Sequence, residues 1–190
     1  MRKQEELLLA NFDTGASFST MTSFNKLLTA VTMGIFATSA AAEPLAEGAA
    51  LPDVSQKNQD DQIVKLAGAG ASGYLLVYFY PKADTPGCTK QACSLRDAYE
   101  KITAAGIRVY GVSIDPVKAQ KAFKEKYKLP FDLLADEDAS VVTAFGVPKK
   151  LSFASRQAFL FKDGKLVWRD LSASTDKQAA DVLAWLAEHP

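Results

Sequence analysis

The chain has 190 residues, with 22 Lys and Arg against 22 Asp and Glu, so its formal net charge is zero. This balance argues against a nucleic-acid binder and against a polybasic membrane binder. The single histidine, His189, is next to last, which argues against Cys–His hydrolases, Ser–His–Asp triads and His-rich metal sites. Two cysteines are too few for a disulfide scaffold, and the length suits one domain with an appended tail.

Residues 21–42 have the order of a secretory signal peptide. Lys26 supplies a positive charge, residues 27–37 form an apolar run without charge, and Ala40, Ala41 and Ala42 form a small-residue cleavage signal. The apolar run is roughly half of the ~20 residues that a membrane span needs, so cleavage after Ala42 is favoured over a membrane anchor. We therefore expect a periplasmic or secreted protein rather than a cytoplasmic one, without stable membrane association after cleavage.

Residues 1–20 contain Glu5, Glu6 and Asp13, which do not suit the charged start of a signal peptide. This favours Met21 as the true start. The sequence thus predicts an N-terminal extension with a signal peptide over residues 1–42 and a folded domain over residues 43–190.

The folded part alternates strand-like and helix-like stretches. The patterns predict strands at residues 74–80, 107–114 and 131–136, a hairpin at 156–171, and one or two short strands before residue 74. They predict helices at residues 86–106, 115–129 with Asp115 as N-cap, 139–147 and 176–189. This order predicts a layered α/β domain with a mixed central sheet flanked by helices.

Cys88 lies where the strand at residues 74–80 is followed by a helix. Thr85 suits the N-cap, Pro86 suits the first helical position, and Gly87 allows a close approach of the backbone. Cys88 then lies in the first turn, where free backbone N–H groups and the positive end of the helix dipole favour a thiolate. Ligands of open α/β sheets also bind at the carboxyl ends of strands.

Cys93 follows Cys88 by five positions. In an intact helix that interval separates the two Cα atoms by about 8.6 Å, whereas a disulfide needs roughly 4.4–6.8 Å. A permanent disulfide would therefore destroy the predicted helix. Cys93 could also be an ordinary buried core residue, because free Cys often packs as a small apolar side chain. The residues that flank Cys88 instead indicate a reactive cysteine rather than a core residue.

The segment "PKADTPGC" matches the peroxiredoxin pattern P-x-x-x-T-x-x-C, and the continuation "TKQACSLRD" resembles the bacterioferritin-comigratory (Q-type) subfamily. The resemblance extends from about Leu51 to the C-terminus. It implies a thioredoxin-like fold and a thiol-dependent peroxidase that uses no metal or bound organic cofactor. It also implies a peroxide substrate and a thioredoxin-like dithiol protein as reductant.

The resemblance also implies roles for five residues. Cys88 would be the peroxidatic cysteine and Cys93 the resolving one, joined in an intramolecular disulfide during the cycle. Thr85 would hydrogen-bond the thiolate and the peroxide, Pro81 would shield the pocket, and Arg156 would be the active-site arginine that opens a later strand. A guanidinium suits that role because it stays charged and presents several donors in one plane.

Several alternatives stay open. Arg96, eight residues after Cys88, is a rival for the active-site arginine, although a salt-bridge role suits it better. Gln91 stands where an acidic residue is frequent in the subfamily, and the signal peptide puts a cytosolic thioredoxin in doubt as the reductant. A secreted thiol–disulfide oxidoreductase, or a redox sensor or chaperone, could use the same fold and cysteines. A monomer is the expected state.

Overall fold

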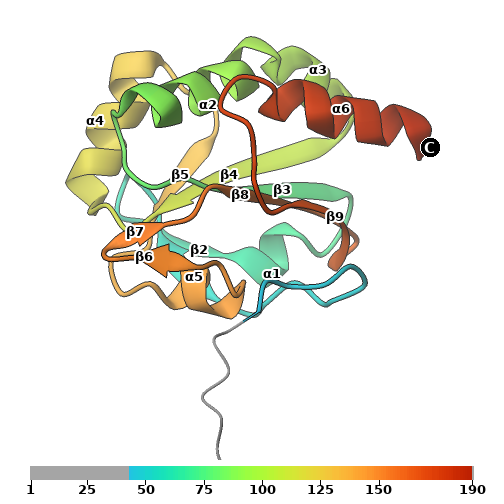
Figure 1. Ribbon diagram of the computed structural model, residues 1–190, viewed down its shortest axis with the longest axis horizontal. Coiled ribbons are helices and arrows are strands. Elements are labelled where there is room, and N and C mark those ends of the chain that lie inside the picture. Colours follow the sequence, from blue (N-terminus) through green and yellow to red (C-terminus); the bar gives the residue numbers. More distant parts are fainter. Residues whose placement is uncertain (1–42, 190) are drawn as a thin grey trace, which may run out of the picture. The chain divides into compact units, whose positions relative to one another are not determined.

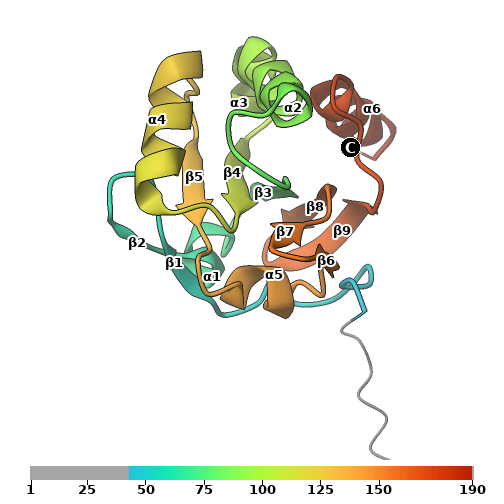
Figure 2. The same cartoon turned by 60° about the vertical axis from the view of Figure 1, so that its left-hand side comes forward.

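The computed structural model describes residues 43–189. Its centre is a five-stranded mixed sheet with the strand order β5-β4-β3-β8-β9 (Figures 1 and 2). Strand β3 pairs in parallel with β4 and antiparallel with β8, while β4 and β5 are parallel and β8 and β9 are antiparallel. The sheet strands are β3 (Tyr74–Phe79), β4 (Ile107–Ser113), β5 (Asp132–Ala135), β8 (Gln157–Lys162) and β9 (Lys165–Asp170).

Helices cover both faces of this sheet. Figures 1 and 2 show α2, α3, α4 and α6 on one face, and α1 and α5 on the other. The helices are α1 (Leu66–Ala69), α2 (Pro86–Asp97), α3 (Tyr99–Ala104), α4 (Val117–Tyr127), α5 (Ser140–Ala144) and α6 (Gln178–Glu188). Two small antiparallel pairs complete the fold: β1 (Ser55–Lys57) with β2 (Ile63–Lys65), and β6 (Lys149–Lys150) with β7 (Phe153–Ala154).

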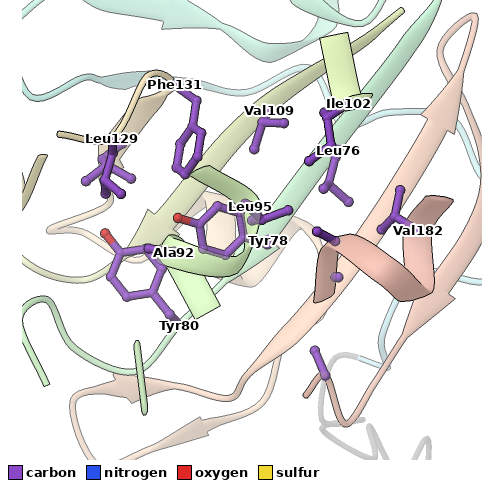
Figure 3. Packing of buried hydrophobic residues seen from close by; sticks show 14 of the residues in the cluster. Leu76, Tyr78, Tyr80, Ala92, Leu95, Ile102, Val109, Leu129, Phe131 and Val182 are labelled. Carbon is purple, nitrogen blue, oxygen red and sulfur yellow. The ribbon is translucent and has the colours of Figure 1, made fainter. Parts of the chain in front are cut away.

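The alternation of side chains along β3 divides the core in two. Leu76, Tyr78 and Tyr80 belong to the hydrophobic cluster under α2, α3, α4 and α6, which we call the helix-rich face (Figure 3). Leu75, Val77 and Phe79 belong to the opposite cluster. Successive side chains of a strand point to opposite sides, so a strand buried on both faces becomes a continuous apolar run. That explains the run predicted for residues 74–80.

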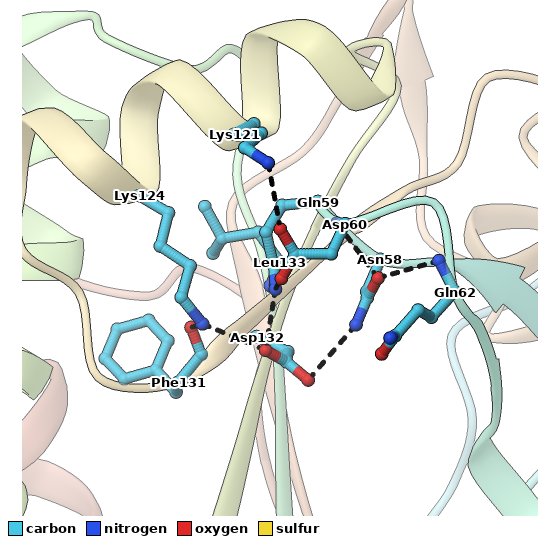
Figure 4. Close-up of polar contacts among 9 residues, drawn as sticks. All are labelled: Asn58, Gln59, Asp60, Gln62, Lys121, Lys124, Phe131, Asp132 and Leu133. Atoms are coloured by element: carbon cyan, nitrogen blue, oxygen red, sulfur yellow. Dashed lines mark hydrogen bonds and ion pairs between the residues drawn. The ribbon is translucent and has the colours of Figure 1, made fainter.

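A polar cluster fastens the turn after β1 to β5 and α4 (Figure 4). Gln59 Nε2 donates to Asp132 Oδ1 at 2.8 Å, and its Oε1 accepts the Leu133 amide at 2.8 Å. Lys124 Nζ bonds Asp132 Oδ1 at 2.9 Å, and Lys121 pairs with Asp60 at 3.3 Å. The first hairpin is thus held to the sheet by side chains rather than by strand pairing alone.

Two details differ from the sequence prediction. The helix predicted over residues 86–106 is interrupted at Ala98, and neither glycine nor proline marks that position. Asp115 does not cap the next helix, which has Pro116 at its N-cap; the carboxylate of Asp115 is bonded elsewhere, as described below. Within residues 43–189, none of the helices has the length and apolar character needed to cross a membrane.

Candidate active site

The site forms where β3 ends and α2 begins. Thr85 is the N-cap residue of α2, and Pro86 and Gly87 are its first two residues, so Cys88 is the third. The Thr89 amide makes the first intrahelical bond, to the Thr85 carbonyl at 2.8 Å. The amides before it have no partner one turn back, as at any helix start. The Cys88 side chain is buried, with 2 % of its surface exposed, beside the positive end of the helix dipole.

The loop that joins β3 to α2 is held by two carboxylates. Asp115 accepts the Ala83 amide at 2.8 Å and the Ser113 hydroxyl at 2.7 Å, which ties the loop to β4. Asp84 has a positive φ of 57° and accepts bonds from Lys126 Nζ at 2.7 Å and the Tyr127 hydroxyl at 2.6 Å. These contacts hold the pKa of Asp84 below its usual value, chiefly through the bond from Lys126. The loop that presents Cys88 is therefore anchored to both β4 and α4.

Thr85 occupies the N-cap position, as the sequence predicts, but its hydroxyl does not cap the helix. It donates to the Lys82 carbonyl at 3.0 Å instead and closes the loop on itself. A hydroxyl that donates to a carbonyl still has its own lone pairs free. The Thr85 hydroxyl bonds the Lys82 carbonyl in this structure, whereas the hydrogen bond to Cys88 Sγ comes from Arg156.

Arg156 lies next to Cys88 although 68 positions separate them in the sequence. Its Nη2 donates to Cys88 Sγ at 3.4 Å. Strand pairing explains this proximity: Phe79 at the end of β3 pairs with Gln157 at the start of β8, so Arg156 enters the sheet where α2 begins. A Cβ atom at Gly87 would lie 3.3 Å from Arg156 Nη2, so the glycine gives the guanidinium the space to approach.

Two buried glutamines continue from the arginine. Arg156 Nη1 donates to Gln91 Oε1, and Gln91 Nε2 donates to Gln178 Oε1 at 2.6 Å. Both glutamine side chains are fully buried, at 0 % exposure. In the sequence, Gln91 stands out only as a departure from an acidic residue, and Gln178 was not predicted to belong to the site. No local signal marks Gln178, which starts α6 far along the chain from its partner.

A cavity of about 480 Å³ adjoins the arginine. Pro81 and Arg156 line it, together with Lys150, Phe153 and Leu171 and four small residues, Ala154, Ser155, Ser172 and Ala173. Its lining includes two cationic side chains and no acidic one. Cys88 is not among the lining residues, so Arg156, which contacts both the cavity and Cys88 Sγ, connects the two.

Cys93 is half-buried on α2, and both cysteines are free thiols. The segment between them is unbroken α-helix, so the geometric separation of about 8.6 Å between Cα atoms applies and the two cannot be bonded in this state.

Arg96 bonds the Tyr127 carbonyl at 2.8 Å and pairs with Asp97 at 2.8 Å. The rival arginine thus connects α2 to the end of α4, while Arg156 contacts the Cys88 sulfur.

Two buried tyrosines lie under α2 and were not predicted to belong to the site. Burial raises the pKa of both Tyr78 and Tyr80, which keeps their hydroxyls protonated. Tyr80 donates to Gln120 Oε1, and Gln120 Nε2 in turn donates to Ser113 Oγ at 2.8 Å. This buried network joins the end of β3 to α4 and β4, next to the carboxylate that holds the active-site loop.

Comparison with known proteins identifies the family. Residues 48–169 match the model of the AhpC/TSA family. The chain belongs to the AhpC/TSA family. The predicted resemblance to Q-type peroxiredoxins is confirmed, because relatives of that name match much of the chain. One is "Peroxiredoxin Q, chloroplastic" of Oryza sativa subsp. japonica, 42 % identical over 125 residues, which are 65 % of this chain and 57 % of the relative.

A second relative is "Peroxiredoxin bcp1" of Schizosaccharomyces pombe, 39 % identical over 131 residues, 67 % of either chain. The chain spans little more than half the length of the rice relative described above. Among solved structures, peroxidoxin BcpB from Mycobacterium tuberculosis superposes with a TM-score of 0.72 at 30 % identity, over 77 % of this chain and 99 % of that one. Peroxiredoxin Q of Xanthomonas campestris superposes at 0.69 and 28 %, over 76 % and 100 %. The predicted thioredoxin-like fold is confirmed.

Proposed function

We propose that the protein is a thiol-dependent peroxidase in which Cys88 attacks the peroxide and Cys93 resolves the product. The observation that carries the proposal is the bond of 3.4 Å between Arg156 Nη2 and Cys88 Sγ at the start of α2, beside a cationic cavity. The membership in the AhpC/TSA family and the names of the relatives support it.

In the first step the Cys88 thiolate attacks one oxygen of the peroxide O–O bond. An S–O bond forms, the O–O bond breaks, and the leaving oxygen takes the electron pair and then a proton as water or alcohol. Cys88 is thereby oxidised to a sulfenic acid. Negative charge develops on the leaving oxygen, and the Arg156 guanidinium, the amides of α2 and the Thr85 hydroxyl are the donors that can stabilise it. Pro81 shields the pocket from one side.

In the second step the Cys93 thiol attacks the Cys88 sulfenic sulfur. An S–S bond forms and the sulfenic oxygen leaves as water. Because the two cysteines cannot meet within an intact helix, α2 unwinds locally for this step. An external dithiol then reduces the disulfide by thiol–disulfide exchange, and we propose a thioredoxin-like protein as that reductant.

Two further functions can use the same cysteines. A thiol–disulfide oxidoreductase would exchange disulfides without consuming peroxide, and a redox sensor would be oxidised once without turning over. An assay of peroxide consumption with an excess of a dithiol separates the three. We expect repeated turnover, with activity abolished by Cys88→Ser. The variant Cys93→Ser should still form the sulfenic acid, trapped with a dimedone-type probe, but not the intramolecular disulfide. Full activity of Cys88→Ser would contradict the proposal.

The predicted signal peptide lies in residues 1–42, outside the described residues, and the plant relatives are named chloroplastic. We propose export with cleavage after Ala42 and a monomeric mature protein. N-terminal sequencing after expression from Met21 in a bacterium with a periplasm should find Glu43 as the first residue. A retained Met21 in the cytoplasmic fraction would contradict export. Size-exclusion chromatography with light scattering tests the monomer.

A further inference from the structure

Gln178 is the first residue of α6, and it is fully buried. The residues around it bring the start of α6 against α2: Ala179 N donates to Ser94 Oγ at 3.4 Å, and Thr175 lies 3.4 Å from where a Cβ of Gly87 would be. An apolar side chain of similar size would fill this position without needing any hydrogen bond. Packing alone therefore does not explain why a glutamine amide is buried at position 178.

The arginine fixes the direction of the whole chain of amides. A guanidinium carries only donors, so Gln91 must turn its oxygen toward Arg156 and its nitrogen toward Gln178. Gln178 must then offer its oxygen to Gln91, which leaves its own nitrogen at the far end. Among residues 43–189, no group accepts a hydrogen bond from Gln178 Nε2, although this nitrogen is buried. The orientation of each amide, which is often ambiguous in structures, is here determined by the donor-only arginine.

We propose that Gln178 is a positioning residue for the peroxide reaction, which acts on Arg156 through Gln91; the proposal rests on the peroxidase function proposed above. Gln178 holds the Gln91 amide in the one orientation that accepts from Arg156. Arg156 in turn keeps its second nitrogen on the Cys88 sulfur. A residue of the C-terminal helix thereby sets the position of the cation that faces the reactive thiolate.

The neutral charge of both glutamines is part of this arrangement. A carboxylate at the same place would hold the guanidinium equally well but would oppose its positive charge at the sulfur. Two amides fix the arginine and leave its full charge directed at Cys88 and at the leaving oxygen. Gln91 also lies between Cys88 and Cys93, so unwinding of α2 for the disulfide separates Gln91 from both partners and releases the arginine.

The test measures the first step alone, by stopped-flow mixing of the reduced protein with hydrogen peroxide across a range of pH. Methionine matches glutamine in length but offers no strong hydrogen-bonding group, so Gln178→Met breaks the chain of amides while it fills the space. We expect Gln178→Met to slow this step by about tenfold, as partners of catalytic groups commonly do. We also expect its pH–rate profile to move to higher pH, since the cation is no longer held against the sulfur.

Two variants serve as controls. Gln178→Glu keeps an acceptor toward Gln91 and removes the unpartnered nitrogen, but it adds a negative charge near the guanidinium, so its rate at neutral pH should fall between those of the parent and of Gln178→Met. Ser94→Ala removes another contact between α2 and α6 without touching the amides, and it should leave both the rate and the pH profile of the first step unchanged. Circular dichroism confirms that each variant is folded.

The outcomes separate this inference from the proposed function. Alkylation of Cys88 by iodoacetamide across the same pH range reports the thiolate without requiring peroxidase activity. If the parent protein does not react with peroxide, the proposed function is wrong. The pH profiles of Cys88 alkylation still test the role of Gln178 in that case. A parent that is active, with Gln178→Met matching it in rate and in both profiles, overturns the role of Gln178. A Gln178→Glu variant as slow as Gln178→Met, or a Ser94→Ala variant that shifts the profile, also overturns it.

Discussion

The two faces of the sheet are built from different residues although β3 contributes to both. On the face of α1 and α5, which we call the phenylalanine face, the buried cluster contains only Leu, Val, Phe and Ala. There Phe79, Phe145 and Phe159 contact one another with ring centroids 5.1–5.7 Å apart. The cluster of the helix-rich face instead includes Tyr78, Tyr80 and Cys88.

These two faces combine a rigid support with a segment that we propose to change its conformation. Close-packed aromatic and aliphatic groups have no low-energy alternative arrangement, so the phenylalanine face holds the sheet fixed. The helix-rich face also has a buried apolar cluster, but individual hydrogen bonds, such as those from Arg156 to Cys88 and to Gln91, add to it at the start of α2. Such bonds can be exchanged for others at modest net free energy, which suits a face whose helix α2 we propose to unwind for the disulfide.

A substitution in the phenylalanine face should cause the greatest loss of stability. Phe159→Ala removes a fully buried ring and should lower the free energy of unfolding by about 3–5 kcal/mol. Urea unfolding followed by circular dichroism measures this change. The rate of the peroxide step per folded molecule should match the parent, because the chemistry lies on the other face. A slower first step in the folded variant would show that the two faces are coupled.

The next prediction concerns the rate of the peroxide step and Arg156, the cation that contacts Cys88. Arg156→Ala removes a donor from the sulfur and from the developing oxyanion, and it should slow the peroxide step by about 10²–10³-fold. The matched control is Arg96→Ala, which removes a guanidinium from α2 that bonds the Tyr127 carbonyl and Asp97 instead. Stopped-flow kinetics compares the two. If Arg96→Ala proves the damaging change, the assignment of the active-site arginine is wrong.

Hydrogen exchange sharpens the contrast between α2 and β3. In the reduced protein the amides from Cys88 to about Leu95 should be protected, whereas in the disulfide form they should exchange about 10²-fold faster, because local unfolding frees their bonds. The amides of β3 should be protected in both forms. Mass spectrometry of peptides from the two forms measures this. Equal protection of α2 in the two states would mean that Cys88 and Cys93 are bridged without unfolding, or are never bridged to each other.

The smallest effect lies in the polar cluster of Figure 4, away from both cores. Burial raises the pKa of Asp132, but hydrogen bonds from Lys124 and Gln59 outweigh it and hold the pKa below the usual value. The native state therefore binds this proton less readily than the unfolded chain, so the contribution to stability is present above the usual carboxyl pKa and is lost as pH falls through the lowered one.

The side chain is partly exposed, so Asp132→Asn should cost less than about 1 kcal/mol at neutral pH. The difference from the parent should shrink toward zero in acid. Urea unfolding at a series of pH values measures it. A difference that stays constant down to pH 2 would mean that the cost comes from lost packing rather than from charge.

Local features of the sequence were enough to predict the strand–loop–helix unit around Cys88. The apolar run, the proline at the first helical position and the glycine affect the backbone through contacts between near neighbours. Their effect on local structure therefore does not depend on the rest of the fold. The same applies to the spacing of Cys88 and Cys93, since helix geometry depends only on residues within one or two turns. Motif resemblance added Arg156, which no local pattern marks.

Tertiary structure alone decided the rest. The antiparallel register of β3 and β8 brings Arg156 to Cys88, and the packing of α6 on α2 brings Gln178 to Gln91. The Asp115 carboxylate likewise bonds the Ala83 amide, 32 positions away, rather than the helix start that the sequence suggested. A side-chain hydrogen bond goes to whichever group the fold brings near, so the sequence determined that Cys88 lies at a helix start and the fold determined what surrounds it.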